Sequence, residues 1–231
     1  VIHTQSSAEY WQRRASLVHT DAEGKDLDEH DKSRIYLFAA TEHAPYPGLG
    51  PQEDVARFPT NPLKVSAFLR AMQDNLDAWV SKGLTPPDSA IPTARDGTLV
   101  PVAVVKAAFP SISDVFPPSD LNRLFVQDHG KEFVHGISSV EPPDEDCERE
   151  YTLLVPAIDA DGNERAGIVV PELAVPVATY TGWNYHLSGE AGEALNHGNG
   201  SYLTFAQTDD VRAPNDPRPS MRSRYASLED Y

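Results

Sequence analysis

The fold is decided by two stretches, Val1-Ile-His-Thr-Gln-Ser-Ser-Ala-Glu-Tyr-Trp11 and Arg34-Ile-Tyr-Leu-Phe-Ala-Ala-Thr-Glu-His-Ala44. Each is predicted to be a buried strand followed by a titratable side chain, Glu9 after the first and His43 after the second. The apolar run of residues 35–40 is typical of a strand covered on both faces of a parallel sheet. An acid and a histidine on loops after two such strands are two members of a hydrolytic triad.

Glu9 and His43 lie 34 positions apart, which leaves room for a crossover between parallel strands. Active sites of open α/β sheets gather at the carboxyl ends of strands, so His43 is placed where a general base would act. Glu9 could accept a hydrogen bond from the imidazole and fix its tautomer. The alternatives are an ordinary surface histidine and an acid favoured by a helix dipole. Asp21 and Glu42 are weaker candidates for the acid.

Helical signals surround the two predicted strands. Ser6 and Ser7 can cap a short helix near residues 8–18. A longer helix is predicted from the N-cap Asn61 to Gly83, with one apolar stripe. The stripe consists of Leu63, Phe68, Leu69, Met72, Leu76, Trp79 and Val80. This alternation of strands and helices is typical of an α/β fold with a parallel sheet.

The second half of the chain has a different character, since most of the 20 prolines in the whole sequence fall after residue 84. Strands are predicted at residues 132–140, 151–158 and 165–170. The segment Asp159-Ala-Asp-Gly-Asn163 favours a hairpin turn over a calcium loop, because the distal bidentate glutamate is missing. We expect strands and helices of an α/β core in residues 1–85, and in residues 86–231 a loop-rich, hairpin-containing extension packed on the same domain.

Composition excludes several classes of function. The net charge of −16 disfavours nucleic acid and anionic membranes as partners. No apolar run approaches the ~18 residues of a membrane span. Cys147 is the single cysteine, so no internal disulfide can form, and its acidic neighbours make it a bystander rather than a nucleophile. No cofactor is indicated, and compartment and oligomeric state stay open.

A metal site is a further, weaker hypothesis. The histidines that could contribute are His3, His19, His30 and His43. Their spacings match no compact ligand pattern, so we expect no metal.

Several motifs together resemble one known family. The stretches that carry the resemblance are residues 3–11, 15–21, 34–43, 61–63, 77–79, 96–101, 154–163 and 178–184. They include His3-Thr-Gln-Ser-Ser-Ala-Glu-Tyr-Trp11, Asp96-Gly-Thr-Leu-Val-Pro101 and Ala178-Thr-Tyr-Thr-Gly-Trp-Asn184. In this order they resemble the C-terminal half of a bacterial group of alpha/beta hydrolase domain proteins.

The resemblance implies the last parallel strands and helices of an α/β-hydrolase fold. In that fold the triad runs serine, acid, histidine. It thus implies Glu9 as acid, His43 as base, and a serine on a nucleophile elbow upstream of Val1. No Gly-x-Ser-x-Gly occurs in these residues, and Gly198-Asn-Gly-Ser201 follows the histidine. We therefore expect a fragment of a serine hydrolase acting on an ester-like small molecule, inactive by itself.

Two points remain open in the sequence. Tyr180 and Trp183 could wall an acyl or alcohol pocket, but an aromatic cluster that closes the core is the favoured alternative. The parent protein could also keep the fold without the chemistry and serve as a binding or assembly module. The upstream sequence distinguishes these readings, because a serine elbow there supports the enzyme.

Overall fold

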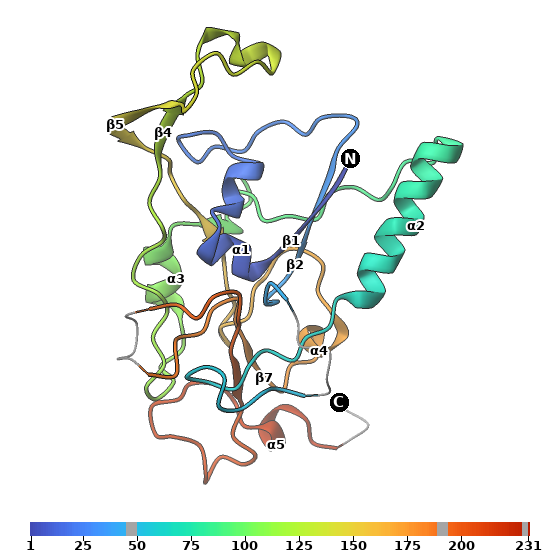
Figure 1. The fold of residues 1–231 in the computed structure, drawn as a ribbon. Helices are drawn as coiled ribbons and strands as arrows, with labels where there is room; N and C mark the ends of the chain where they lie inside the picture. The colour runs from blue at the N-terminus through green and yellow to red at the C-terminus, as the bar shows by residue number, and fades with distance from the viewer. Residues whose placement is uncertain (45–49, 189–193, 228–230) are drawn as a thin grey trace.

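The computed structural model describes residues 1–44, 50–188, 194–227 and 231. Its central feature is a parallel pair of strands, β1 (Ile2–Ser6) and β2 (Arg34–Phe38), paired from Ile2 opposite Arg34 to Ser6 opposite Phe38. Figure 1 shows the two strands side by side, running toward α1. The predicted parallel arrangement of these strands is confirmed, so their carboxyl ends meet at one edge.

The two strands differ in burial. Four of the five residues of β2 are buried, and its second edge forms parallel bridges from Tyr36 to Ala90 and from Phe38 to Ile168. In β1 only Ser6 is buried, while His3 and Thr4 are exposed. The prediction of a buried first strand was therefore wrong for most of its length, because the described residues cover β2 on both edges but β1 on one.

The crossover between the strands contains the predicted short helix in two pieces. Helix α1 (Ser7–Gln12) is followed by a 3-10 helix at Ala15–Val18. Arg14 lies between them with φ of 62°, a left-handed conformation that breaks the α-helical path. Five of the six residues of α1 are buried, including Tyr10 and Trp11, and Glu9 is the exception.

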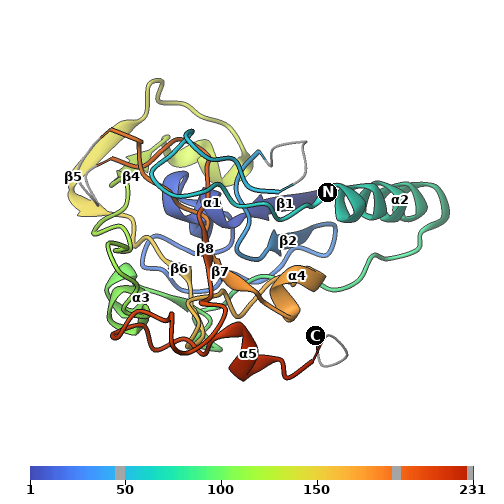
Figure 2. The same ribbon diagram turned by 90° about the horizontal axis from the view of Figure 1, so that it is seen from below.

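Helix α2 (Ser66–Lys82) is the long predicted helix, but it begins at Ser66 rather than beside Asn61. The Asn61 side chain is buried and donates to the carbonyls of Ala40 and Thr181. Gly83 ends the helix in the left-handed conformation, as predicted. No residue of α2 is buried, although Phe68 packs on the core. In Figures 1 and 2 the helix stands at the side of the molecule.

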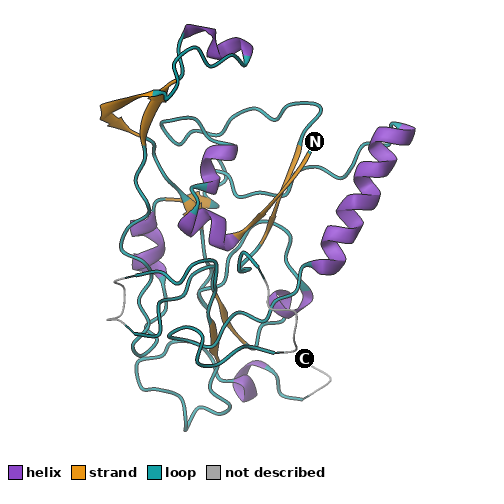
Figure 3. Cartoon of the chain, in the orientation of Figure 1, coloured by secondary structure: helices purple, strands orange, loops and turns teal. Residues whose placement is uncertain are grey.

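The remaining elements are short. They are β3 (Leu99–Val100), α3 (Val102–Ala108), β4 (Phe125–Asp128), β5 (Asp144–Glu150), β6 (Val155–Pro156), α4 (Pro171–Ala174), β7 (Ala178–Tyr180), β8 (Tyr202–Thr204) and α5 (Met221–Arg224). β3 pairs with β6, β4 with β5, and β7 with β8, all antiparallel. Figure 3 shows how much of the chain between these elements is loop.

The β4–β5 pair forms an arm that projects from the body in Figure 1. The strand predicted at residues 132–140 was wrong, since Lys131–His135 is a 3-10 helix at the end of this arm. Residues 159–163 do form a tight hairpin turn, closed by the bridge from Ile158 to Glu164 and by hydrogen bonds between Asp159 and Asn163.

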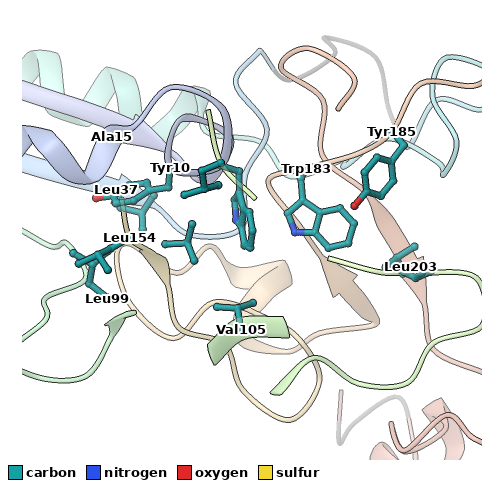
Figure 4. Packing of buried hydrophobic residues seen from close by; sticks show 13 residues of the cluster. Tyr10, Ala15, Leu37, Leu99, Val105, Leu154, Trp183, Tyr185 and Leu203 are labelled. Carbon is teal, nitrogen blue, oxygen red and sulfur yellow. The ribbon is translucent and has the colours of Figure 1, made fainter. Parts of the chain in front are cut away.

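The main hydrophobic cluster draws on both halves of the sequence. Figure 4 shows Tyr10, Ala15 and Leu37 packed with residues from the later elements, among them Leu154 and Trp183. Burial of such side chains is the principal favourable term in folding. A second cluster includes Ala39, Ala40, Leu63 and Tyr180. Across the residues that the structure describes, no helix combines the length and apolar character that a membrane crossing requires.

Candidate active site

Glu9 lies in the first turn of α1, directly after the carboxyl end of β1. The backbone N–H of Ser6 donates to Oε2 of Glu9, so the carboxylate covers one of the unpaired amides at the helix start. A carboxylate is also favoured there by the helix dipole. The Glu9 side chain is 21% exposed. These local contacts hold the Glu9 carboxylate in place and leave its second oxygen, Oε1, available to another partner.

His43 follows β2 on a loop that is fixed by backbone contacts. The carbonyl of Thr41 accepts from the amide of Ala8 at 3.1 Å, which joins this loop to the start of α1. The amide of His43 donates to the carbonyl of Gly198 at 2.9 Å. The imidazole itself is about half exposed, with 47% of its side-chain surface accessible.

The two side chains meet where the strands end. Nδ1 of His43 lies 2.9 Å from Oε1 of Glu9, within hydrogen-bond distance. An ionised carboxylate can only accept, so Nδ1 carries the proton of this bond. In a neutral imidazole this leaves Nε2 with a lone pair, the arrangement of a general base.

The two weaker candidates for the acid have other partners. Asp21 accepts from the amides of Glu23 and Lys25 in its own loop. Glu42 is buried at 2% exposure, and its Oε2 accepts from the amide of Gly200 at 3.1 Å. The described hydrogen bonds of Glu42 therefore anchor the loop at residues 198–200, and none of them is to the imidazole of His43.

Tyr180 and Trp183 are each 2% exposed. Trp183 lies in the main core cluster, as Figure 4 shows, with its ring centroid 6.2 Å from Trp11 and 5.7 Å from both Phe109 and Tyr185. Tyr180 packs in the second cluster, 5.5 Å from the ring of Tyr202. These positions favour the packing alternative, and a role in substrate binding stays a prediction.

His19, His30 and Cys147 have surroundings other than the Glu9–His43 pair. Nε2 of His19 lies 2.8 Å from the hydroxyl oxygen of the buried Tyr10, and burial lowers the pKa of His19. His30 is exposed beside Asp31, and Cys147 is also exposed. Among the described residues, no group of three or more histidine, cysteine or acidic side chains could hold a metal ion.

A cavity of about 620 Å³ lies at the end of α1 away from Glu9. It is lined by Gln12, Arg13 and Arg14, by residues 118–122, and by Tyr185, Ala194, Leu195 and His197. Its size is that of a small-molecule pocket. Gln12 connects it to the candidate site, because its side-chain oxygen accepts from the amide of Gly198, whose carbonyl accepts from His43.

Sequence reasoning missed Glu164. This glutamate lies just after the 159–163 turn and is 7% exposed. It accepts hydrogen bonds from Ser7 and Ala40, which belong to the two segments that carry Glu9 and His43. Burial raises the pKa of Glu164 to about 7, against the opposing effect of these hydrogen bonds. No motif marks it, because its partners are 157 and 124 positions away.

Comparison with known proteins places the chain in a family. A family model described as "Alpha/beta hydrolase domain" matches residues 1–231, and the chain therefore belongs to this family. The predicted resemblance is confirmed at that level. No match was found among curated proteins or among solved structures.

Proposed function

We propose that this member of the alpha/beta hydrolase domain family supplies the acid and the base of a serine hydrolase that acts on carboxylic esters or related acyl compounds. The observation that carries the proposal is the 2.9 Å contact between Glu9 Oε1 and His43 Nδ1 at the carboxyl ends of adjacent parallel strands. Membership of a hydrolase family supports the reaction class. The order of the acid before the histidine agrees with the family's triad.

The proposed reaction has two steps. A serine attacks the ester carbonyl while Nε2 of His43 takes its proton, and the same nitrogen then gives that proton to the leaving alcohol. Water, activated by His43 in turn, releases the acid and restores the serine. Glu9 holds the imidazole in the tautomer with a proton on Nδ1 and stabilises the imidazolium that forms in each step.

The nucleophile, on this proposal, belongs to a segment outside residues 1–231. The supporting observation is that these residues contain no Gly-x-Ser-x-Gly, and that Ser201 is buried with its hydroxyl donating to the carbonyl of Trp183. Such a serine would approach Nε2 of His43 from the exposed side of the imidazole. The oxyanion-hole amides would come with it.

The experiment is a comparison of variants in the full-length protein. Hydrolysis of a series of p-nitrophenyl esters is measured for the wild type and for His43→Ala, and a fluorophosphonate probe reports a reactive serine. We expect His43→Ala to lower kcat by about 10⁴-fold or more, as for other triads, and to suppress labelling. His30→Ala is the matched control, since His30 also pairs with a carboxylate but is 73% exposed. Near-normal hydrolysis by His43→Ala would exclude the mechanism.

A further inference from the structure

Glu164 lies between the two turns that carry the candidate catalytic side chains. Its Oε1 accepts from the hydroxyl of Ser7, two residues before Glu9. Its Oε2 accepts from the backbone amide of Ala40 at 2.6 Å, three residues before His43. One side chain thus joins the start of α1 to the end of β2.

Both contacts are made at positions that have little freedom. Ser7 and Ala40 are fully buried, so a lost partner would leave a donor without water to replace it. Ala40 has φ of 57°, an uncommon conformation for a residue with a side chain. Its peptide groups are held from two sides, since the Asn61 side chain donates to the Ala40 carbonyl at 2.5 Å. The direction in which the chain leaves toward His43 is set by these bonds.

A carboxylate costs more free energy to bury than a neutral side chain that could accept the same two hydrogen bonds. Its hydrogen-bond partners in the described part of the chain are two neutral donors, and no described cation forms an ion pair with it. Burial of a carboxylate without a cation raises its pKa, here to about 7. A buried carboxyl group with a perturbed pKa next to a candidate site is itself a candidate for a functional role.

We propose that Glu164 is a positioning residue, which sets the approach of Glu9 to His43 by fixing Ser7 and Ala40 relative to each other. This inference rests on the proposed function for its effect on catalysis. Glu164 is not a catalytic residue, because its described side-chain hydrogen bonds are with Ser7 and Ala40 and not with the imidazole or the Glu9 carboxylate. Its action is through the backbone of the two turns.

Two substitutions separate positioning from mere filling of space. Glu164→Gln keeps both contacts, because its oxygen can accept from Ala40 while its amide group donates to the Ser7 hydroxyl. Glu164→Leu fills a similar volume and loses both. In the full-length protein we expect Glu164→Gln to keep kcat within a few-fold, and Glu164→Leu to lower kcat by about 10²-fold with KM little changed, as for a small misplacement of reacting groups.

A second readout does not depend on catalysis. The two ring ¹⁵N shifts of His43, recorded in alkaline buffer, report which nitrogen carries the proton. We expect the wild type and Glu164→Gln to show the proton on Nδ1, and Glu164→Leu to show a shift toward the Nε2 tautomer as the Glu9 contact is lost. Asp216→Asn is the control, because it neutralises another buried carboxylate, whose partner is Arg218, and should leave the tautomer unchanged.

The outcomes distinguish this inference from the proposed function. A folded Glu164→Leu protein with an unchanged His43 tautomer would overturn the positioning role, whatever the activity of the parent protein. If Glu164→Leu does not fold, Ser7→Ala removes one of the two contacts at lower cost, and an unchanged tautomer there has the same meaning. A shifted tautomer in a protein without esterase activity would support the positioning role and count against the proposed function alone.

Discussion

Gly182 lies against Ser7 with no room for a side chain. A Cβ atom built on Gly182 would lie 2.5 Å from both the carbonyl carbon and the Cβ of Ser7, closer than real contacts allow. Ser7 is the first residue of α1 and bonds Glu164. The close approach therefore joins the segment between β7 and β8 to the turn that carries Glu9.

We expect Gly182→Ala to destabilise the protein by about 1–3 kcal/mol, the usual cost of overpacking in a core, and to displace Ser7. Urea unfolding measures this decrease in the free energy of unfolding. Gly83→Ala is the control: Gly83 has φ of 69° but open space around it, so only backbone strain of about 1 kcal/mol is expected there. A Gly182→Ala protein as stable as the wild type would contradict this packing.

The buried Glu164 predicts a distinctive pH dependence of stability. Its folded pKa is raised by burial from 4.5 to about 7. Between these values the folded protein holds a proton that the unfolded chain has lost, so this group's stabilisation is complete below pH 4.5 and is lost as pH rises through 7. The shift amounts to about 3 kcal/mol.

Glu164→Gln has no such titration. The free energy of unfolding of Glu164→Gln, minus that of the wild type, should therefore grow by about 3 kcal/mol between pH 4.5 and pH 8. Urea unfolding of both proteins across this range gives the difference and cancels the contributions of other titrating groups. A difference that stays constant with pH would show that Glu164 titrates alike in the folded and unfolded chains.

Arg218 and Asp216 form a buried ion pair near the end of the chain. Nε and Nη2 of Arg218 donate to the two Asp216 oxygens at 2.9 and 2.7 Å, while Nη1 bonds Thr179 and the Leu203 carbonyl at 2.9 Å. Burial acts to raise the pKa of Asp216, but the hydrogen bonds and charge of Arg218 outweigh it and lower that pKa. The pair therefore holds a tail segment onto β7 and β8.

Arg218→Met should cost about 3–5 kcal/mol at neutral pH, since it removes the guanidinium that pairs with the buried Asp216 carboxylate. Because the folded pKa of Asp216 is lowered, its stabilisation is present above the ordinary value near 3.8 and is lost as pH falls below it. The difference in the free energy of unfolding between the wild type and Arg218→Met should therefore become smaller in acid. The double variant Arg218→Met/Asp216→Leu should recover part of the loss, and a double variant worse than the single one would contradict the charge argument.

The sequence predicted the parts of the site that local patterns encode. The apolar run of residues 35–40 predicted β2, and the position of each titratable residue just after a strand predicted that Glu9 and His43 would meet. The left-handed Gly83 likewise marked the end of α2. The signals for β2 and for the end of α2 are local, and the meeting of Glu9 and His43 followed from them through one general rule, that the carboxyl ends of parallel strands share one edge of a sheet.

Features that depend on distant partners could not be predicted. The α2 stripe suggested burial, yet Leu69, Leu76 and Val80 are exposed, because periodicity does not say whether another element covers a face. Asn61 looked like an N-cap, but its amide is used by carbonyls at positions 40 and 181. Glu164 carried no local signal, since both of its partners come from the other end of the chain.

The central claim is that Glu9 and His43 act as one catalytic unit, and a double-variant cycle on kcat in the full-length protein tests it most directly. Glu9→Gln keeps the size of the side chain but removes the charge that holds the imidazole, so we expect kcat to fall by about 10³–10⁴-fold. The kcat of His43→Ala should be lower still, and the kcat of the double variant should be no lower than that of His43→Ala alone. If the two losses multiply instead, or if Glu9→Gln retains wild-type kcat, the contact between these residues plays no part in the chemistry.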